Sequence, residues 1–270
     1  MKKHLSTIIL IMVLLAGLSL LLYPTVSDYW NSFHQSRAIA GYVEEVANLD
    51  EEAYRQILAD AESYNESLWK RANRYFPTAE EHAEYEAMLN VSGNGIMGYI
   101  QIPSIDCTLP IYHGVDESIL QIAVGHIESS SLPVGGEGTH CVLSGHRGLP
   151  SAKLFSNLDR LSEGDVFMLQ ILNETYTYEV DQIRIVLPEE VGELELIRGK
   201  DYCTLVTCTP YGVNTHRLLV RGSRVANTEE ALSIRVTAEA IKLDPMLVAL
   251  ALAVPMLLLL LIWLLIRYRK

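Results

Sequence analysis

The stretch TLVTCTPYGVNTHRLLVRG, residues 204–222, decides how the second half of this chain folds. The run from Tyr202 to Thr207 is rich in Thr, Val and aromatic character and predicts a β-strand that ends at Cys208, where a Pro-Tyr-Gly cluster stops it. The run from Arg217 to Arg224 predicts a returning strand. If the two runs pair across the loop, Arg217 lies near Cys208, so that a thiol and a guanidinium become neighbours.

Length and charge limit what such a pair can do. The chain has 270 residues, of which 49% are hydrophobic, and a formal net charge of -12. That length allows one well-cored domain with additional segments. The acidic balance and the lack of a long basic run argue against a nucleic-acid partner.

Two long apolar segments lie near the chain ends. The first runs from Leu5 to Leu22 behind two lysines, and the second from Met246 to Ile266 ahead of a basic tail. Both are typical of membrane-spanning helices. Their basic flanks predict cytoplasmic termini and an exported middle. The first segment is also open to interpretation as a signal peptide; we favour an uncleaved anchor because no clear small-x-small site precedes Tyr23.

Residues 27–88 show helical periodicity. Asp50, followed by two glutamates, predicts a helix cap with acids in the first turn. We expect a second helix from Asp60 to Tyr75, before Pro77. Our interpretation is a helical stalk that packs on the domain and spaces it from the membrane. The apolar positions at helical spacing are Ala38, Tyr42, Val46, Leu49, Ala53 and Ile57.

From Gly98 on, the pattern changes to short β runs separated by Gly, Pro, Asn and Asp, which predicts a β-barrel or sandwich. Short helical inserts are expected at 118–123 and 152–161. The β runs cover residues 98–103, 108–112, 141–144, 165–171, 175–187, 202–207 and 217–225.

The four cysteines lack the paired spacing of a zinc site and the density of a disulfide scaffold. Cys107, Cys141 and Cys203 lie in apolar, strand-like contexts, where a buried thiol acts as a small hydrophobic residue. A bridge between Cys141 and Cys203 stays open at this point.

A histidine partner for Cys208 must come from elsewhere in the chain. His146 stands out because it follows the β run Cys141–Ser144 and precedes a Gly-Leu-Pro turn, so it too lies where a strand becomes a loop. The other histidines of the β region are His113, His126, His140 and His216.

A thiol, an imidazole and a fixed cation together suit acyl transfer. A thiolate such as that of Cys208 attacks a carbonyl carbon, and an imidazole such as that of His146 exchanges protons with the thiol and the leaving amine. Arg217 stays protonated and cannot act as a base. Its role would be to hold the developing oxyanion or the substrate backbone.

These motifs resemble the sortase family. Residues 204–210 and 214–222 look like the sortase cysteine and arginine signature, and SGHRGLP at 144–150 resembles the histidine motif. Further matches, YHG at 112–114 and SLPVGG at 131–136, are similar to the class C, pilin-polymerising branch. Two flanking membrane segments are likewise similar to that branch.

The resemblance implies a mainly β fold, a closed sortase barrel, with Cys208 as nucleophile, His146 as acid/base and Arg217 as oxyanion or substrate clamp. The enzyme would be a transpeptidase of Gram-positive bacteria that spans the membrane more than once and uses the chemistry of a thiol protease. It would cleave an LPXTG-like signal between Thr and Gly and pass the acyl group to a lysine of another pilin. No cofactor or metal is needed, although calcium serves some class A relatives.

On this reading the chain has five parts. They are the N-terminal anchor at 1–26, a helical stalk or lid region at 27–97, the catalytic barrel at 98–226, a linker at 227–245 and a C-terminal transmembrane helix with a basic cytoplasmic tail at 246–270.

One departure concerns the lid. Many class C sortases carry an Asp-Pro-aromatic lid motif before the barrel, and residues 75–95 contain no such tripeptide. Asp244-Pro245 is the only Asp-Pro pair and adjoins the second apolar segment. Lid-based self-inhibition is therefore in doubt. Two alternatives also stay open: a sortase that anchors surface proteins to peptidoglycan, and a non-catalytic envelope scaffold.

Overall fold

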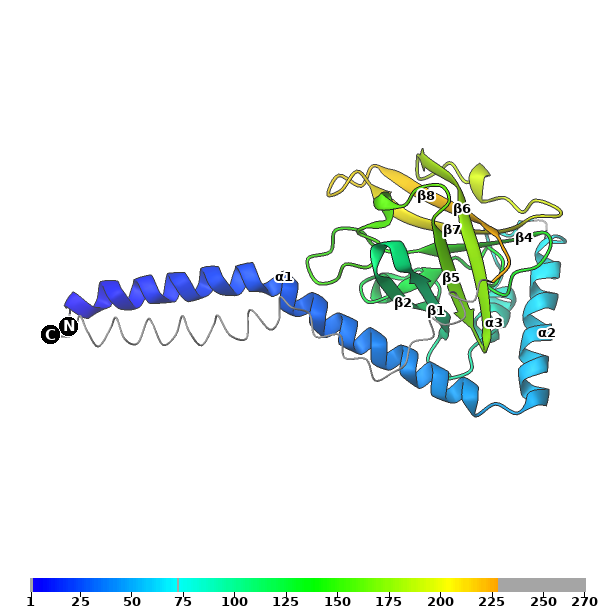
Figure 1. Ribbon diagram of the computed structural model, residues 1–270, viewed down its shortest axis with the longest axis horizontal. Coiled ribbons are helices and arrows are strands. Elements are labelled where there is room, and N and C mark those ends of the chain that lie inside the picture. Colours follow the sequence, from blue (N-terminus) through cyan, green and yellow to red (C-terminus); the bar gives the residue numbers. More distant parts are fainter. Residues whose placement is uncertain (1, 72, 228–270) are drawn as a thin grey trace. The chain divides into compact units, whose positions relative to one another are not determined.

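The computed structural model describes residues 2–71 and 73–227. Its strands close into an eight-stranded barrel in the order β1-β2-β3-β4-β7-β8-β6-β5 (Figure 1), so the predicted mainly β barrel is confirmed. The predicted linker from residue 228 on and the C-terminal transmembrane helix lie outside the described residues. The strands are β1 (Ile96–Ile102), β2 (Cys107–His113), β3 (Val124–His126), β4 (Thr139–Ser144), β5 (Val166–Ile171), β6 (Glu174–Val186), β7 (Asp201–Thr209) and β8 (His216–Arg224).

Seven of these strands match the predicted β runs to within about two residues, whereas β3 was not predicted, because three residues are too few to show alternation. Most neighbours pair antiparallel. The exceptions are β2 with β3 and β4 with β7, which run parallel. The parallel pairing of β4 with β7 matters for the site because it brings the C-terminal ends of these two strands to the same edge of the barrel.

Alternation along the strands separates an inner face from an outer face. Leu205 of β7 and Val220 of β8 are fully buried in the main core. Phe167 and Tyr178 stack inside the barrel with ring centroids 5.5 Å apart, and a Cβ at Gly222 would lie 2.7 Å from the Phe167 ring. Position 222 therefore has to be glycine for this stacked pair to fit.

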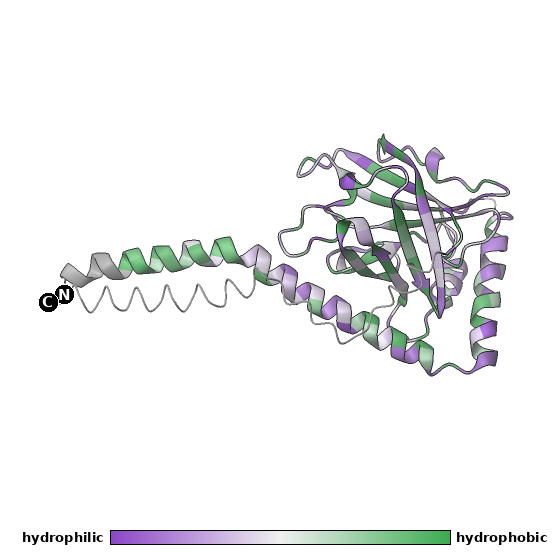
Figure 2. Ribbon diagram, in the orientation of Figure 1, coloured by the Kyte–Doolittle hydropathy of each residue, from purple (hydrophilic) through white to green (hydrophobic). Residues whose placement is uncertain are grey.

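Helix α1 (Lys2–Ala47) has two different halves (Figure 2). From Ile9 to Val26 the helix is mainly apolar and exposed, and Ile9–Ala47 contains a stretch long and apolar enough to cross a membrane, a property that signal sequences share. The second half buries Ile39, Tyr42 and Val46, which recur at helical spacing. The Tyr42 hydroxyl donates to Met97 O at 2.9 Å, which ties this half to β1.

Helix α2 (Glu51–Leu68) begins as predicted, because Asp50 accepts a hydrogen bond from the Ala53 amide. The predicted second helix at 60–75 is wrong. The helix continues through Asp60 and ends at Leu68, where Arg71 turns toward Glu81 and Glu84 of the next helix and pairs with both. That helix is α3 (Ala79–Ala87), which a capping box at Thr78 starts.

Of the two predicted helical inserts, one forms a helix and the other does not. The first forms a short helix, α4 (Glu117–Leu120). The second is wrong: only a 3₁₀ turn, η2 (Leu158–Arg160), forms there. Leu154 has a φ of 39°, and Phe155 donates its amide to His146 O, so the backbone between residues 152 and 157 follows the barrel rather than a helix.

Candidate active site

Cys208 and Arg217 lie opposite each other on neighbouring strands. They are register partners in the antiparallel pairing of β7 with β8, as the pairing predicted from the sequence requires. The strand extends one residue past the predicted end, to Thr209. Both side chains stand at the same edge of the barrel, next to the loop at 210–215.

His146 reaches the same edge through the parallel pairing of β4 with β7. Ser144, the last residue of β4, is the partner of Val206. Beyond it, the Gly145 amide donates to Val206 O at 3.0 Å, and Thr207 Oγ1 donates to Gly145 O at 2.7 Å. His146 and Cys208 each follow by two residues from the last register pair. The structure thus brings together all three residues predicted from the sequence.

The three residues share the outer face of the sheet with a small apolar patch, the outer cluster, formed by Val142, Val206 and Leu219. Strand alternation places Val206 with Cys208, and Leu219 with Arg217, on one side. Ile127, Val186 and Leu194 pack against this cluster. The thiol therefore lies beside a buried apolar cluster on the outer face of the sheet rather than in the barrel interior.

Arg217 is held by its own loop. Its Nη1 donates to Asn214 O at 3.3 Å and to His216 O at 3.2 Å. Within residues 2–71 and 73–227 it pairs with no carboxylate. Its positive charge is therefore available to a ligand beside the half-buried Cys208.

Glu117, the first residue of α4, contacts His146. Its Oε2 lies 3.2 Å from His146 Nε2. Hydrogen bonds with Gln121 and His146 lower the pKa of Glu117, so its carboxylate stays charged at neutral pH. The contact occupies Nε2, and Nδ1 has no hydrogen-bond partner among the described residues. The sequence analysis missed Glu117, since an acid after a glycine turn carries no motif of its own.

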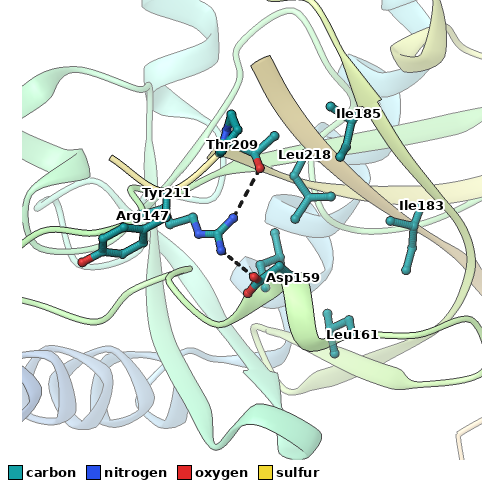
Figure 3. A pocket seen from close by; sticks show the side chains of 10 residues that line it. Arg147, Asp159, Leu161, Ile183, Ile185, Thr209, Tyr211 and Leu218 are labelled. Atoms are coloured by element: carbon teal, nitrogen blue, oxygen red, sulfur yellow. Dashed lines mark hydrogen bonds and ion pairs between the residues drawn. The ribbon is translucent and has the colours of Figure 1, made fainter. Parts of the chain in front are cut away.

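Arg147 anchors the loop behind His146 (Figure 3). It pairs with Asp159, lies 3.4 Å from Thr209 Oγ1 and stacks near the Tyr211 ring. This links the segment after His146 to the segment after Cys208. Beneath it is a pocket of about 440 Å³ at the barrel mouth, with apolar walls from Leu158, Leu161, Ile183, Ile185, Pro210 and Leu218.

Three of the other histidines of the barrel, His113, His126 and His140, have structural partners, whereas His216 begins β8 beside Arg217. Burial lowers the pKa of His113 and of His140. His140 lies 2.9 Å from Glu195 O and 2.7 Å from Thr204 Oγ1. His126 is fully buried, with Nε2 2.8 Å from Ser131 O. These rings hold loops onto strands and do not face the Cys208 edge.

The segment between α2 and α3 includes the start of the region, residues 75–95, in which the sequence lacks an Asp-Pro-aromatic lid motif. Arg74 Nη2 lies 2.7 Å from Glu195 Oε2, and the Tyr75 hydroxyl donates to Glu195 Oε1 at 2.8 Å. Glu195 follows Leu194, which packs on the outer cluster. The segment is therefore fastened to the β6–β7 connection by other residues than an Asp-Pro-aromatic motif, while Phe76 is 79% exposed.

No group of three or more His, Cys, Asp or Glu side chains in the described part of the chain is arranged to hold a metal ion. What the site offers is a thiol, an imidazole with a carboxylate behind it and an unpaired guanidinium. That set suits acyl transfer through a thioester.

Comparison with known proteins agrees with this chemistry. The Sortase domain family model matches residues 100–225. Sortase D of Bacillus subtilis is 30% identical over 148 residues, which cover 54% of this chain and 72% of that protein. The chain belongs to the sortase family, whose members are cysteine transpeptidases that anchor or polymerise surface proteins.

Solved structures narrow the likeness to class C sortases. The crystal structure of sortase C1 from Streptococcus agalactiae is 53% identical with a TM-score of 0.70, covering 71% of this chain and 100% of that one. Sortase C of Clostridium perfringens with the C-terminal cell wall sorting motif is 44% identical with a TM-score of 0.63, covering 71% and 99%. The fold and the enzyme class therefore agree with the sequence prediction, and a non-catalytic scaffold is excluded.

Proposed function

We propose that this sortase polymerises pilins, joining the threonine of an LPXTG-like signal on one subunit to a lysine of the next. The observation that carries the proposal is the meeting of Cys208, His146 and Arg217 at one edge of the β4-β7-β8 sheet. The similarity to structures described as pilus or pilin sortases supports the choice of substrate.

In the first half-reaction, the Cys208 thiolate attacks the threonine carbonyl carbon and forms a C–S bond. The guanidinium of Arg217 stabilises the oxyanion, which its freedom from carboxylates allows. Collapse breaks the C–N bond to glycine, and His146 gives the leaving amine its proton. The product is a thioester between Cys208 and the pilin.

In the second half-reaction, a lysine amine of the acceptor pilin attacks the thioester carbon. His146 takes the proton that the amine loses, and the C–S bond breaks to restore the Cys208 thiolate. The isopeptide bond replaces the peptide bond that was cleaved, so no external energy source is required.

Glu117 is a positioning residue in this scheme. Its carboxylate holds His146 through Nε2, so Nδ1 is the nitrogen that exchanges protons with the thiol and the amines. A negative charge on that side of the ring also favours the imidazolium that forms when the thiol ionises.

The layer over the outer cluster is the proposed contact surface for the sorting signal. Val142, Val206 and Leu219 are themselves buried beneath the half-buried Ile127, Val186 and Leu194, and the cluster ends at Cys208 and Arg217. The leucine and proline of an LPXTG-like signal are apolar, and laying them against this covering layer would bring the threonine carbonyl to the thiol.

The proposed location is the cell membrane, with both termini cytoplasmic and the barrel outside. The apolar first half of α1 supports an N-terminal anchor. Two anchors would hold the enzyme at the surface where its substrates emerge, which suits chain growth by successive transfers.

The test is the formation of covalent pilin ladders in cells. Cys208→Ala should abolish high-mass ladders, while the control Cys107→Ala, a half-buried thiol away from the site, should leave them intact. Ladders that persist in Cys208→Ala cells would overturn the proposal. Mass spectrometry of the product separates the alternative: a peptidoglycan amine at the new bond would mean cell-wall anchoring.

A further inference from the structure

Cys141 and Cys203 lie side by side inside the barrel. They are register partners in the parallel pairing of β4 with β7. Neighbouring strands lie about 4.8 Å apart, which is within the Cα separation of about 4.4–6.8 Å that a disulfide spans. Both side chains belong to the main core, with exposures of 2% and 0%, and both are free thiols.

The position of this pair links it to the active site. Along β4 and its extension, His146 follows Cys141 at the same distance in sequence at which Cys208 follows Cys203 along β7. The two thiols therefore mark the register of the two strands that deliver the imidazole and the nucleophile. A bond between them would fix that register covalently.

The two thiols are chemically unequal. Burial opposes ionisation, yet hydrogen bonds with Cys203 and with His126 lower the pKa of Cys141. Burial, followed by the contact with Cys141, raises the pKa of Cys203. This inequality belongs to the folded barrel, so it does not set which thiol attacks first while the chain is folding.

We propose that Cys141 and Cys203 are an oxidative modification site: a dithiol that a low-molecular-weight disulfide converts to an intramolecular disulfide, locking β4 to β7. The thiolate of one of the two cysteines attacks the small disulfide, forms a mixed disulfide and releases one small thiolate. The thiol of the other cysteine then loses its proton and attacks the sulfur of the first, which releases the second small thiolate. Two protein thiols are oxidised, and one small disulfide is reduced to two thiols.

The bond should stabilise the barrel. It would close a loop that runs from β4 through β5 and β6 to β7, and cross-linking a long loop removes conformational entropy from the unfolded chain. Because the pair is buried, the exchange takes place before the barrel closes, during folding. The effect on stability rests on the strand register alone and does not depend on the proposed substrate.

The experiment uses the full chain in detergent micelles with Cys107→Ala and Cys208→Ala, so that only these two thiols remain. The protein is refolded from denaturant at a series of ratios of oxidised to reduced glutathione, then unfolded and alkylated with N-ethylmaleimide. We expect two alkyl groups under reducing conditions, and none plus a Cys141–Cys203 cross-linked peptide under oxidising conditions. The melting temperature should be several degrees higher in the oxidised sample.

Single variants are the controls. With Cys141→Ala or Cys203→Ala added, the melting temperature should no longer respond to the glutathione ratio. Peptide mapping of the unsubstituted chain provides the same readout if the combined variant does not fold. Two alkylated thiols at every ratio, or glutathione attached to Cys141 without ring closure, would overturn the proposal. Alkylation and melting temperature do not depend on transpeptidation. A failure of the disulfide proposal can therefore be told apart from a failure of the proposed function.

Discussion

Cys203 and Cys208 lie on the same strand, β7, and have opposite environments. They are five positions apart in the strand, and because side chains alternate, an odd offset makes them face opposite sides of the sheet. Cys203 is fully buried in the barrel core, and Cys208 is half-buried on the outer face at the strand end. The same residue type therefore packs in one position and is accessible to substrate in the other.

Strand β4 repeats this division. His140, within the strand, bonds to Glu195 O and Thr204 Oγ1, and both contacts fasten loops and strands together. His146, just beyond the strand, contacts only the exposed carboxylate of Glu117 among the described side chains. The comparison teaches that reactive groups lie where the backbone leaves the sheet, and that the same groups inside the ladder serve packing.

The largest expected effect, and the strongest test of this comparison, comes from replacing each of the two histidines with alanine. His146→Ala should lower kcat/KM for a sorting-signal peptide by about 10³–10⁴-fold, because general acid–base catalysis contributes on that order. Its melting temperature should stay near that of the parent. His140→Ala should do the reverse, with a lower melting temperature and a nearly unchanged kcat. A large loss of kcat in His140→Ala, measured on folded protein, would contradict the division.

A second test compares two of the three arginines of β8, Arg217 and Arg221. Arg217→Lys should lower kcat by about 10²–10³-fold, since an ammonium cannot reproduce the planar donor geometry for an oxyanion. Arg221, four residues further along the strand, forms a salt bridge with Asp181, whose Oδ1 lies 2.9 Å from Arg221 Nε. Arg221→Lys should therefore change kcat little. If Arg217→Lys lowered kcat as little as Arg221→Lys does, a positive charge alone would be sufficient at position 217.

Sequence patterns predicted the positions of Cys208, Arg217 and His146 at strand ends because these residues lie in or beside regular strands. Arg217 was expected near Cys208 if the last two β runs pair across their loop, and the structure pairs them. His146 needed one further step, the parallel pairing of β4 with β7, which no local pattern encodes. The motif resemblance supplied that step.

The failures have physical causes as well. The helix expected at 152–161 does not form because Leu154 adopts a positive φ and the apolar side chains there face the barrel mouth. The break expected at Asp60 does not occur because Ala61, Tyr64 and Leu68 continue one buried face. Glu117 was missed since its role depends on a contact between residues distant in sequence.

A third test alters the junction between strand and loop. A Cβ at Gly145 would lie 2.7 Å from the Phe155 ring. Gly145→Ala should therefore cost about 1–3 kcal/mol of stability through overpacking, and should lower activity about tenfold as His146 shifts. Gly41→Ala is the control, because nothing lies within 4 Å of its Cβ position in α1 and alanine favours a helix. Urea unfolding curves should separate the two in sign.

The smallest expected effect comes from Glu117. Its contact with His146 is exposed, so Glu117→Gln should lower kcat/KM by only about two- to fivefold at neutral pH. The pH profile should reveal more than this rate. Hydrogen bonds with Gln121 and His146 lower the pKa of Glu117, so in the parent the charged contact is lost only as pH falls through that lowered pKa; glutamine does not titrate, so the part of the acidic limb due to Glu117 should be missing while the other limb stays in place.

Glu179→Gln, an exposed site on β6, controls for the loss of one negative charge from the surface and should leave both limbs unmoved. If Glu117→Gln and Glu179→Gln gave the same profile, the carboxylate beside His146 would be an ordinary surface charge. A shift confined to Glu117→Gln would instead show that the reactive histidine at the strand end, unlike His140 inside the strand, is tuned by a charged side chain rather than by backbone and hydroxyl contacts.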